Sequence, residues 1–147
     1  MKDLLVAISD RLKTEVGELM WVDYDDGQID VYDEQPNVEF PCALIRISLL
    51  DCKDICDGAQ QCNVELDIRL TFNKKHTLPL PSTDEESRDQ SLLRYDLLEK
   101  VYCALQGFEI KGCSPLDRGS FLREERNDDL IVHKLLFNSV FMDYSAS

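Results

Sequence analysis

The 147-residue sequence lacks any apolar run close to the ~20 residues that a membrane-spanning helix needs. Its opening, MKDLLVAISDRLK, has charges where a secretory signal peptide would have its apolar centre. We therefore expect a protein that does not cross a membrane and stays in the compartment where it is made. A chain of this length buries about 68–70% of its unfolded surface. Residues 1–147 are therefore expected to form a single domain around one core.

Basic residues are scarce: 16 Lys and Arg stand against 29 Asp and Glu, for a formal net charge of −13. Between Lys13 and Arg46 there is no basic residue at all. A strongly negative protein is repelled by phosphate backbones and anionic lipids, so binding to nucleic acids or membranes is disfavoured. The acid-rich stretch predicts one strongly negative surface. That surface is either a solvated face or one that repels DNA or meets a basic partner.

The sequence has no C-x2-C pair of the kind found in zinc sites, and no G-x-S-x-G or glycine-rich phosphate loop. It does contain cysteines at positions 42, 52, 56, 62, 103 and 113. Without an export signal, these are expected to be free thiols. Cys42, Cys62 and Cys103 lie in apolar patterns and are expected to be buried. These features predict a protein that is not an enzyme and holds no cofactor.

Residues 21–34, WVDYDDGQIDVYDE, have the acid density of a calcium loop. Counted from Asp23, the next acids fall at positions 3 and 4 and the glycine at 5, whereas an EF-hand needs an acid at 5 and the glycine at 6. Apolar residues alternate on both sides of Asp26-Gly27, which is typical of a turn or short hairpin. We therefore expect no metal site here.

Hydrophobic periodicity predicts helices over residues 3–18 and 92–106 and strands over 38–50 and 62–72. It also predicts a pair of strands within residues 119–144, joined by a turn at 126–129. A polar loop is expected over residues 51–61, and a long irregular excursion over 73–91. The order α-β-β(-β)-α-β-β predicts an α+β fold, with two helices on one face of a mostly antiparallel sheet of about four to five strands. Leu78 and Leu80, the only large apolar residues of the excursion, are expected to contact another subunit.

Several segments resemble a known family when taken in order. They are DDGQIDVYDEQPNVEFPCALIRIS, QQCNVELDIRLTF, RYDLLEKVYCALQGF and PLDRGSFLREERNDDLIVHKLLFNSVFMDY. Together they resemble the small tail terminator and tail completion proteins of long-tailed phages and prophages, and more narrowly a prophage version found in Bacteroidetes-type genomes. The points of similarity include Gly27-Gln28, Phe40-Pro41, the helix end at residues 104–107 and an acidic turn before the strand that contains His133.

The resemblance implies a structural role without catalysis. Proteins of this family form a ring, commonly of six subunits, that caps the tail tube and helps to join tail to head. The expected partners are therefore copies of the chain itself, the tail tube protein and head-completion proteins. The expected location is the cytoplasm of a bacterial host and then the virion tail. In such a ring an acidic surface that includes Asp23, Asp25, Asp26 and Asp30 would line the lumen and repel passing DNA.

Two other classes of function stay open at this point. One is a non-viral cytosolic binding or adaptor domain of similar α+β fold, which would be monomeric or dimeric and would have a ligand pocket. The other is a metal-dependent enzyme that uses the acidic stretch, which a divalent ion bound at Asp23, Asp25 and Asp26 would indicate.

Overall fold

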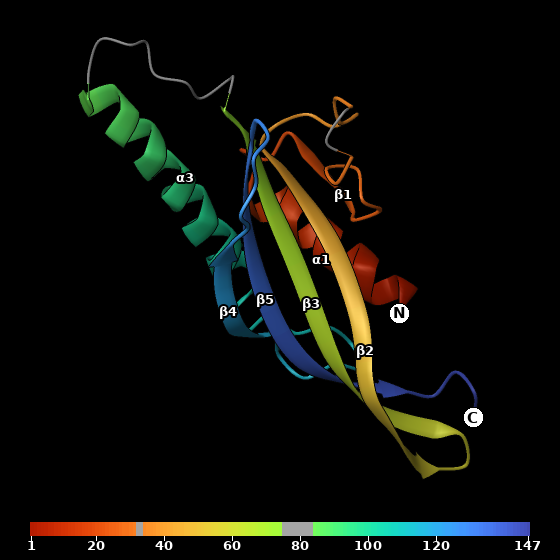
Figure 1. Ribbon diagram of the computed structural model, residues 1–147. Helices are drawn as coiled ribbons and strands as arrows, with labels where there is room; N and C mark the ends of the chain where they lie inside the picture. The colour runs from red at the N-terminus through yellow and green to blue at the C-terminus, as the bar shows by residue number, and fades with distance from the viewer. Residues whose placement is uncertain (32–33, 75–83) are drawn as a thin grey trace.

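A computed structural model of the chain describes residues 1–31, 34–74 and 84–147, in which two helices pack on a five-stranded sheet (Figure 1). The elements in chain order are α1 (Lys2–Glu15), β1 (Trp21–Tyr24), β2 (Cys42–Cys56), β3 (Ala59–Asn73), α3 (Asp84–Leu105), β4 (Asp117–Arg123) and β5 (Leu130–Asp143). The sheet order is β1-β2-β3-β5-β4, and every pair is antiparallel except β1 with β2. The predicted α+β fold is confirmed.

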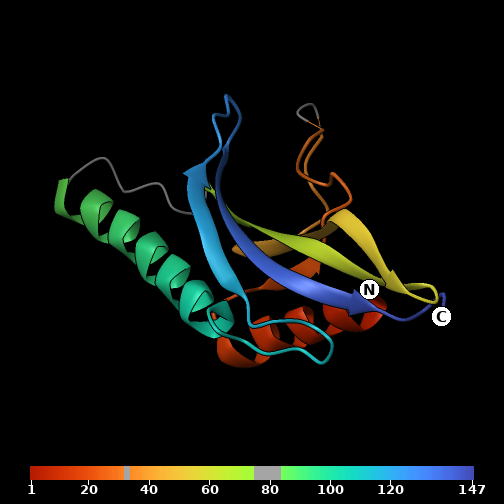
Figure 2. The ribbon, with the colours of Figure 1, turned by 90° about the horizontal axis from the view of Figure 1, so that it is seen from below.

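The main core lies between the helices and one face of the sheet (Figure 2). The alternation predicted for the strand over residues 62–72 is confirmed, because its apolar residues from Val64 to Phe72 are all buried against the helices. Leu4, Ile8 and Leu12 form the buried stripe of α1, at the spacing of an amphipathic helix. The predicted helical stripe is therefore core.

Strands β2 and β3 form a long hairpin, so the prediction of a polar loop over residues 51–61 is wrong. Pairing runs from Cys42 opposite Thr71 to Cys56 opposite Ala59. Asp57 and Gly58 close the hairpin with φ of 40° and 81°, the left-handed conformation that a tight two-residue turn requires. The strands continue through polar residues because the end of the hairpin projects into solvent, where such residues cost nothing.

The opposite face of the sheet is partly covered by the chain between β1 and β2. Ile29 packs there with Cys42, Leu44, Leu130 and Val132, and a second apolar cluster results. The turn predicted around Asp26-Gly27 is present, and Gly27 has φ of 83°. No second strand follows it within residues 25–31 and 34–41. The outer face of β3 is therefore covered by the chain itself at this end of the sheet, where Arg69 and Thr71 are buried.

Helix α3 begins at Asp84, earlier than predicted, so residues 84–91 are helical and do not belong to an irregular excursion. The predicted interface residues Leu78 and Leu80 lie outside the described residues. Gly107, at φ of 73°, ends the helix as predicted. In the part of the chain that the structure describes, no helix is long and apolar enough to span a bilayer.

Candidate interaction surface

The N-terminal half of α3 extends beyond the sheet (Figure 1), and exposed apolar side chains and two arginines from this helix and strand β4 form a candidate surface. We call it the α3–β4 face. Its members are Leu92, Leu93, Arg94, Tyr95, Phe121 and Arg123. Leu92, Leu93 and Tyr95 are 53%, 64% and 53% exposed, respectively. The C-terminal half of the same helix buries Leu97, Leu98, Val101 and Leu105 in the main core.

An aromatic cluster around His133 lies beneath this face. The His133 ring stacks on Phe121 at 5.5 Å between centroids and also contacts Tyr95 at 5.8 Å and Phe72 at 6.3 Å. The side chain is almost fully buried, and its Nδ1 atom has no hydrogen-bond partner among the described residues. Burial, together with the positive charges of Arg123 and Arg94, lowers the pKa of His133 to about 4.

The lowered pKa of His133 predicts a loss of stability in mild acid. The unfolded chain takes up a proton near His133's ordinary pKa of 6.5, whereas the folded chain does so only near 4. The contribution of neutral His133 to the free energy of unfolding is therefore fully present above about pH 6.5 and is lost as the pH falls toward 4. We expect the free energy of unfolding to decrease by about 2 kcal/mol between roughly pH 7 and pH 4.5.

The matched variant for this prediction is His133→Phe, which keeps an aromatic ring in the cluster and removes the titrating group. Its free energy of unfolding, measured by denaturant titration at several pH values, should be nearly flat over that interval. Hydrogen bonds from arginine lower the pKa values of the Asp30 and Asp128 carboxyl groups. The contribution of these two groups to the free energy of unfolding is therefore lost only at lower pH. An equally steep decrease in the variant would contradict the assignment to His133.

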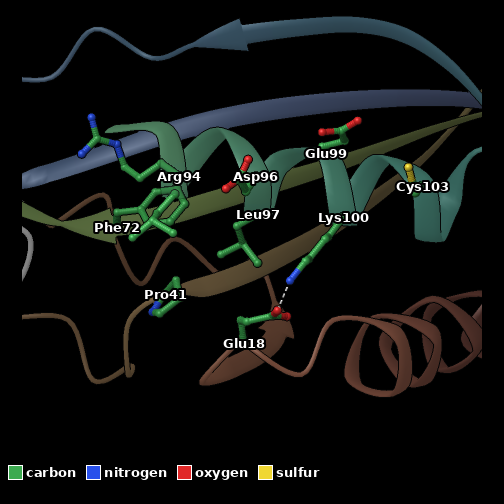
Figure 3. Close-up of a pocket in the computed structure, with 10 residues that line it drawn as sticks. Glu18, Pro41, Phe72, Arg94, Asp96, Leu97, Glu99, Lys100 and Cys103 are labelled. Atoms are coloured by element: carbon green, nitrogen blue, oxygen red, sulfur yellow. Dashed lines mark hydrogen bonds and ion pairs between the residues drawn. The ribbon is translucent and has the colours of Figure 1, made fainter. Parts of the chain in front are cut away.

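A groove of about 840 Å³ runs along α3 on the side of Glu18 and Pro41 (Figure 3). Phe72 and Leu97 line it, and Lys100 forms an ion pair with Glu18 across it. That hydrogen bond from Lys100 lowers the pKa of the Glu18 carboxyl group. The groove therefore combines an apolar lining with charged groups, a composition that is typical of binding sites.

The predicted acidic surface divides into paired and unpaired residues. The Asp25 side chain is only 1% exposed and forms an ion pair with Arg69 at 3.2 Å. Asp30 binds the same guanidinium at 2.8 Å, and that hydrogen bond lowers the pKa of Asp30. Asp23 is half-buried and Asp26 is exposed, and neither pairs with a basic side chain of the described residues. Only Asp23 and Asp26 of the four predicted residues are thus available to a partner.

Sequence reasoning missed the arginines that bind these acids. Arg69, on β3, also donates to both carboxylate oxygens of Glu124, at 2.8 and 2.9 Å. Arg126, whose side chain is 3% exposed, binds Asp128 at 2.6 Å and the backbone oxygen of Ile29. Although burial opposes it, hydrogen bonds to carboxylates raise the pKa of Arg69. The only signal in the sequence was the complete lack of basic residues within the acidic stretch, which requires distant partners.

The acidic stretch does not form a calcium loop in the structure. Within residues 1–31, 34–74 and 84–147, no group of three or more His, Cys, Asp or Glu side chains is placed to hold a metal ion. The carboxylates of Asp25 and Asp30 are directed instead to arginine. That the protein binds no calcium stays a prediction, which an unchanged melting temperature at millimolar calcium would support.

The cysteines are free thiols in the structure. Cys42 and Cys62 are buried, as expected, but Cys103 is exposed, so that part of the expectation is wrong. Cys103 lies on the outer side of the helical stripe that carries Leu97, Val101 and Leu105, and it lines the groove (Figure 3). Burial raises the pKa of Cys42 to about 12. A hydrogen bond with Cys52 and burial raise the pKa of Cys62 to about 11.

Thiol labelling should separate the cysteines into two groups. Cys52, Cys56 and Cys103 are exposed and should react quickly with a maleimide at neutral pH. Cys42 and Cys62 should react only after unfolding, because their thiolates are disfavoured and their sulfur atoms are buried. Peptide mass spectrometry after timed labelling measures this order. Fast labelling of Cys42 in the folded protein would contradict the burial described above.

Two comparisons with known proteins find no match for this chain. No protein-family model matches the chain, and a search of curated proteins finds no significant match. The fold by itself defines a class, an α+β domain with two helices on one face of a mostly antiparallel sheet. Within this fold, the exposed α3–β4 face is the candidate surface for a partner.

Proposed function

We propose that the chain is a structural phage or prophage tail protein of the tail terminator type. In this role copies of the chain form a ring, commonly hexameric in the family it resembles, that caps the tail tube and helps to join tail to head. The role needs self-association and binding to tail and head proteins, and it has no catalytic step. Its partners would be further copies, the tail tube protein and head-completion proteins, first in a bacterial cytoplasm and then in the virion.

The observation that carries this proposal is the exposed α3–β4 face. Leu92, Leu93 and Tyr95 are each more than half exposed, so an isolated monomer would leave them largely in water. Phe121 of β4 is 42% exposed and adds apolar surface on the same side of the sheet, whereas Leu122 points to the opposite face. Large exposed apolar side chains that gather on one side of a protein are typical of a protein–protein interface.

A non-viral binding or adaptor domain is the second candidate, and the groove along α3 favours it. A groove of about 840 Å³ is within the size range of ligand sites. In that case the protein would stay monomeric or dimeric, and a ligand would contact Phe72 and Leu97. Measuring the molar mass of the purified protein by light scattering over a wide range of concentrations distinguishes this candidate from a ring.

Disrupting the gene in the phage or prophage genome that carries it tests the proposed role. Without its terminator a tail tube has no cap, so lysates are expected to contain overlong tubes and filled heads that lack tails. Electron microscopy of the lysates shows both products, and a plasmid copy of the gene should restore normal particles. Normal tails in the disrupted strain would rule out the terminator role.

The predicted arm residues Leu78 and Leu80 can be tested in the same system. If they contact a neighbouring subunit, replacing both with Ser should weaken assembly and leave the monomer folded. Circular dichroism and light scattering measure the two properties separately. An unfolded double variant would place these leucines in the core of the domain.

A further inference from the structure

Two arginines of the α3–β4 face have no acidic partner within the described part of the chain. Arg94 donates from Nη2 to the Ser91 hydroxyl at 3.1 Å, but its Nε atom is buried without a partner. The side chain of Arg123 forms no ion pair or hydrogen bond among the same residues. Burial and the charge of Arg123 lower the pKa of Arg94. In a chain of net charge −13, these two mutually repelling cations therefore form no ion pair with a carboxylate of the described residues.

The guanidinium of Arg94 includes a donor that lacks an acceptor. Its Nε–H is buried and has no hydrogen-bond partner among the described residues. Buried polar groups in folded proteins nearly always have a hydrogen-bond partner, because an unpaired one costs about 1–3 kcal/mol. Carboxylates are the groups that guanidinium ions bind best, often with two hydrogen bonds. The face is therefore suited to an acidic partner.

The opposite side of the molecule carries carboxylates that are free to pair. We call it the acidic edge; its residues are Asp23, Asp26, Glu34 and Glu39. None of them forms an ion pair with a described residue. The sheet order places β1, beside this edge, and β4 at the two ends of the sheet. In both views α3 and the segment after β1 lie on opposite sides of the molecule (Figures 1 and 2).

We propose that the α3–β4 face binds the acidic edge of a second copy of this chain, with Arg94 and Arg123 pairing with the carboxylates of Asp23 and Asp26. The exposed leucines and aromatic rings around the arginines supply the apolar area of the contact. Because the two surfaces differ and lie on opposite sides, each copy can bind two neighbours head to tail, the type of contact that forms a ring when the rotation between neighbours closes and an open filament when it does not. The biological role of this contact rests on the proposed function, in which copies of the chain form a ring.

A charge swap between two variants tests this contact. The first variant carries Arg94→Glu and Arg123→Glu, and the second carries Asp23→Arg and Asp26→Arg. Alone, each presents two like-charged surfaces, so it should associate at least about tenfold more weakly than the unchanged protein. Mixed in equal amounts, they should associate again, because each face of one variant then meets an oppositely charged edge of the other. Sedimentation equilibrium measures all four samples.

The matched control carries Lys53→Glu and Lys111→Glu, which change the net charge as the first variant does but lie in the β2–β3 hairpin and the α3–β4 connection. This control should associate like the unchanged protein, and circular dichroism should show that every variant is folded. The contact is overturned if the unchanged protein is monomeric at all concentrations, or if folded variants do not recover on mixing. It is also overturned if the second variant assembles normally but slows DNA ejection from phage, because its acids then line the lumen.

These outcomes are separate from those of the proposed function. The gene disruption decides the tail role without reference to any particular surface. A positive disruption phenotype with a negative charge swap overturns only this contact. Normal tails after disruption, combined with a successful charge swap, would leave a self-associating protein of another function.

Discussion

Replacing Arg69 with Met is expected to lower the free energy of unfolding by about 3–5 kcal/mol, the largest effect of any single substitution that we predict. Arg69 is buried and binds Asp25, Asp30 and Glu124. Without it the Asp25 carboxylate, which is 1% exposed, keeps a hydrogen bond from the Gly27 N–H at 3.1 Å and, among the described residues, one cation, Arg46 at 3.5 Å. An uncompensated buried charge is costly because the protein interior solvates it poorly.

The same substitution should also loosen the segment between β1 and β2. Asp25 and Asp30 connect that segment to β3 through Arg69, and the segment covers the second apolar cluster around Ile29. Amide hydrogen exchange in residues 25–31 is therefore expected to increase more than the global change in stability requires. Exchange mass spectrometry measures this directly.

The control for this prediction is Arg46→Met, because Arg46 binds the same carboxylate of Asp25 but is 54% exposed. Exposed ion pairs contribute little, so its effect on the free energy of unfolding should stay below about 1 kcal/mol. Urea titration of both variants gives the comparison. Similar small effects for Arg69 and Arg46 would show that the buried cluster is not a major source of stability.

The second large effect is expected from replacing Leu92 and Leu93 together with Ser. If the α3–β4 face is an interface, the pair should weaken association by about a hundredfold, since burying each exposed leucine surface contributes about 1–1.5 kcal/mol. The melting temperature of the monomer should change little, because both side chains are exposed in the folded chain. Light scattering and thermal unfolding separate the two effects.

The matched control is the double replacement of Leu97 and Leu98 with Ser, on the next turn of the same helix. These side chains are buried in the main core, so the change should destabilise the monomer itself by several kcal/mol. Unchanged association of a well-folded Leu92, Leu93 variant would exclude these residues from the interface. The proposed tail function would then have to rely on another surface.

Much of the fold follows from local patterns that the sequence determines by itself. The alternation from Val64 to Phe72 predicts a strand with one buried face, because side chains in a strand point to opposite sides in turn. The stripe of Leu4, Ile8 and Leu12 predicts an amphipathic helix for the same geometric reason. Turn residues such as Gly107 determine where an element ends, since few other residues adopt a positive φ at low cost.

Local patterns did not predict the full lengths of two elements. Asp57-Gly58 closes a hairpin that lengthens β2 and β3, although residues 51–61 are too polar to suggest strands. Residues 84–91 are part of α3, although they contain no apolar residue that would mark a helical stripe. In both cases backbone hydrogen bonding continues an element that a neighbouring segment has already begun, and side-chain hydrophobicity does not record this.

The candidate surface depended on tertiary structure even more strongly. The sequence determined that acids dominate residues 15–39, but not that Asp25 and Asp30 are bound by Arg69 whereas Asp23 and Asp26 are not. That division depends on how the segment after β1 folds over β3, tens of residues away in sequence. Likewise, Leu93 and Leu97 share a helix and a residue type, yet one is exposed and the other is core. Only the position where α3 leaves the sheet decides between them, because burial is a property of the neighbours that a side chain meets in space.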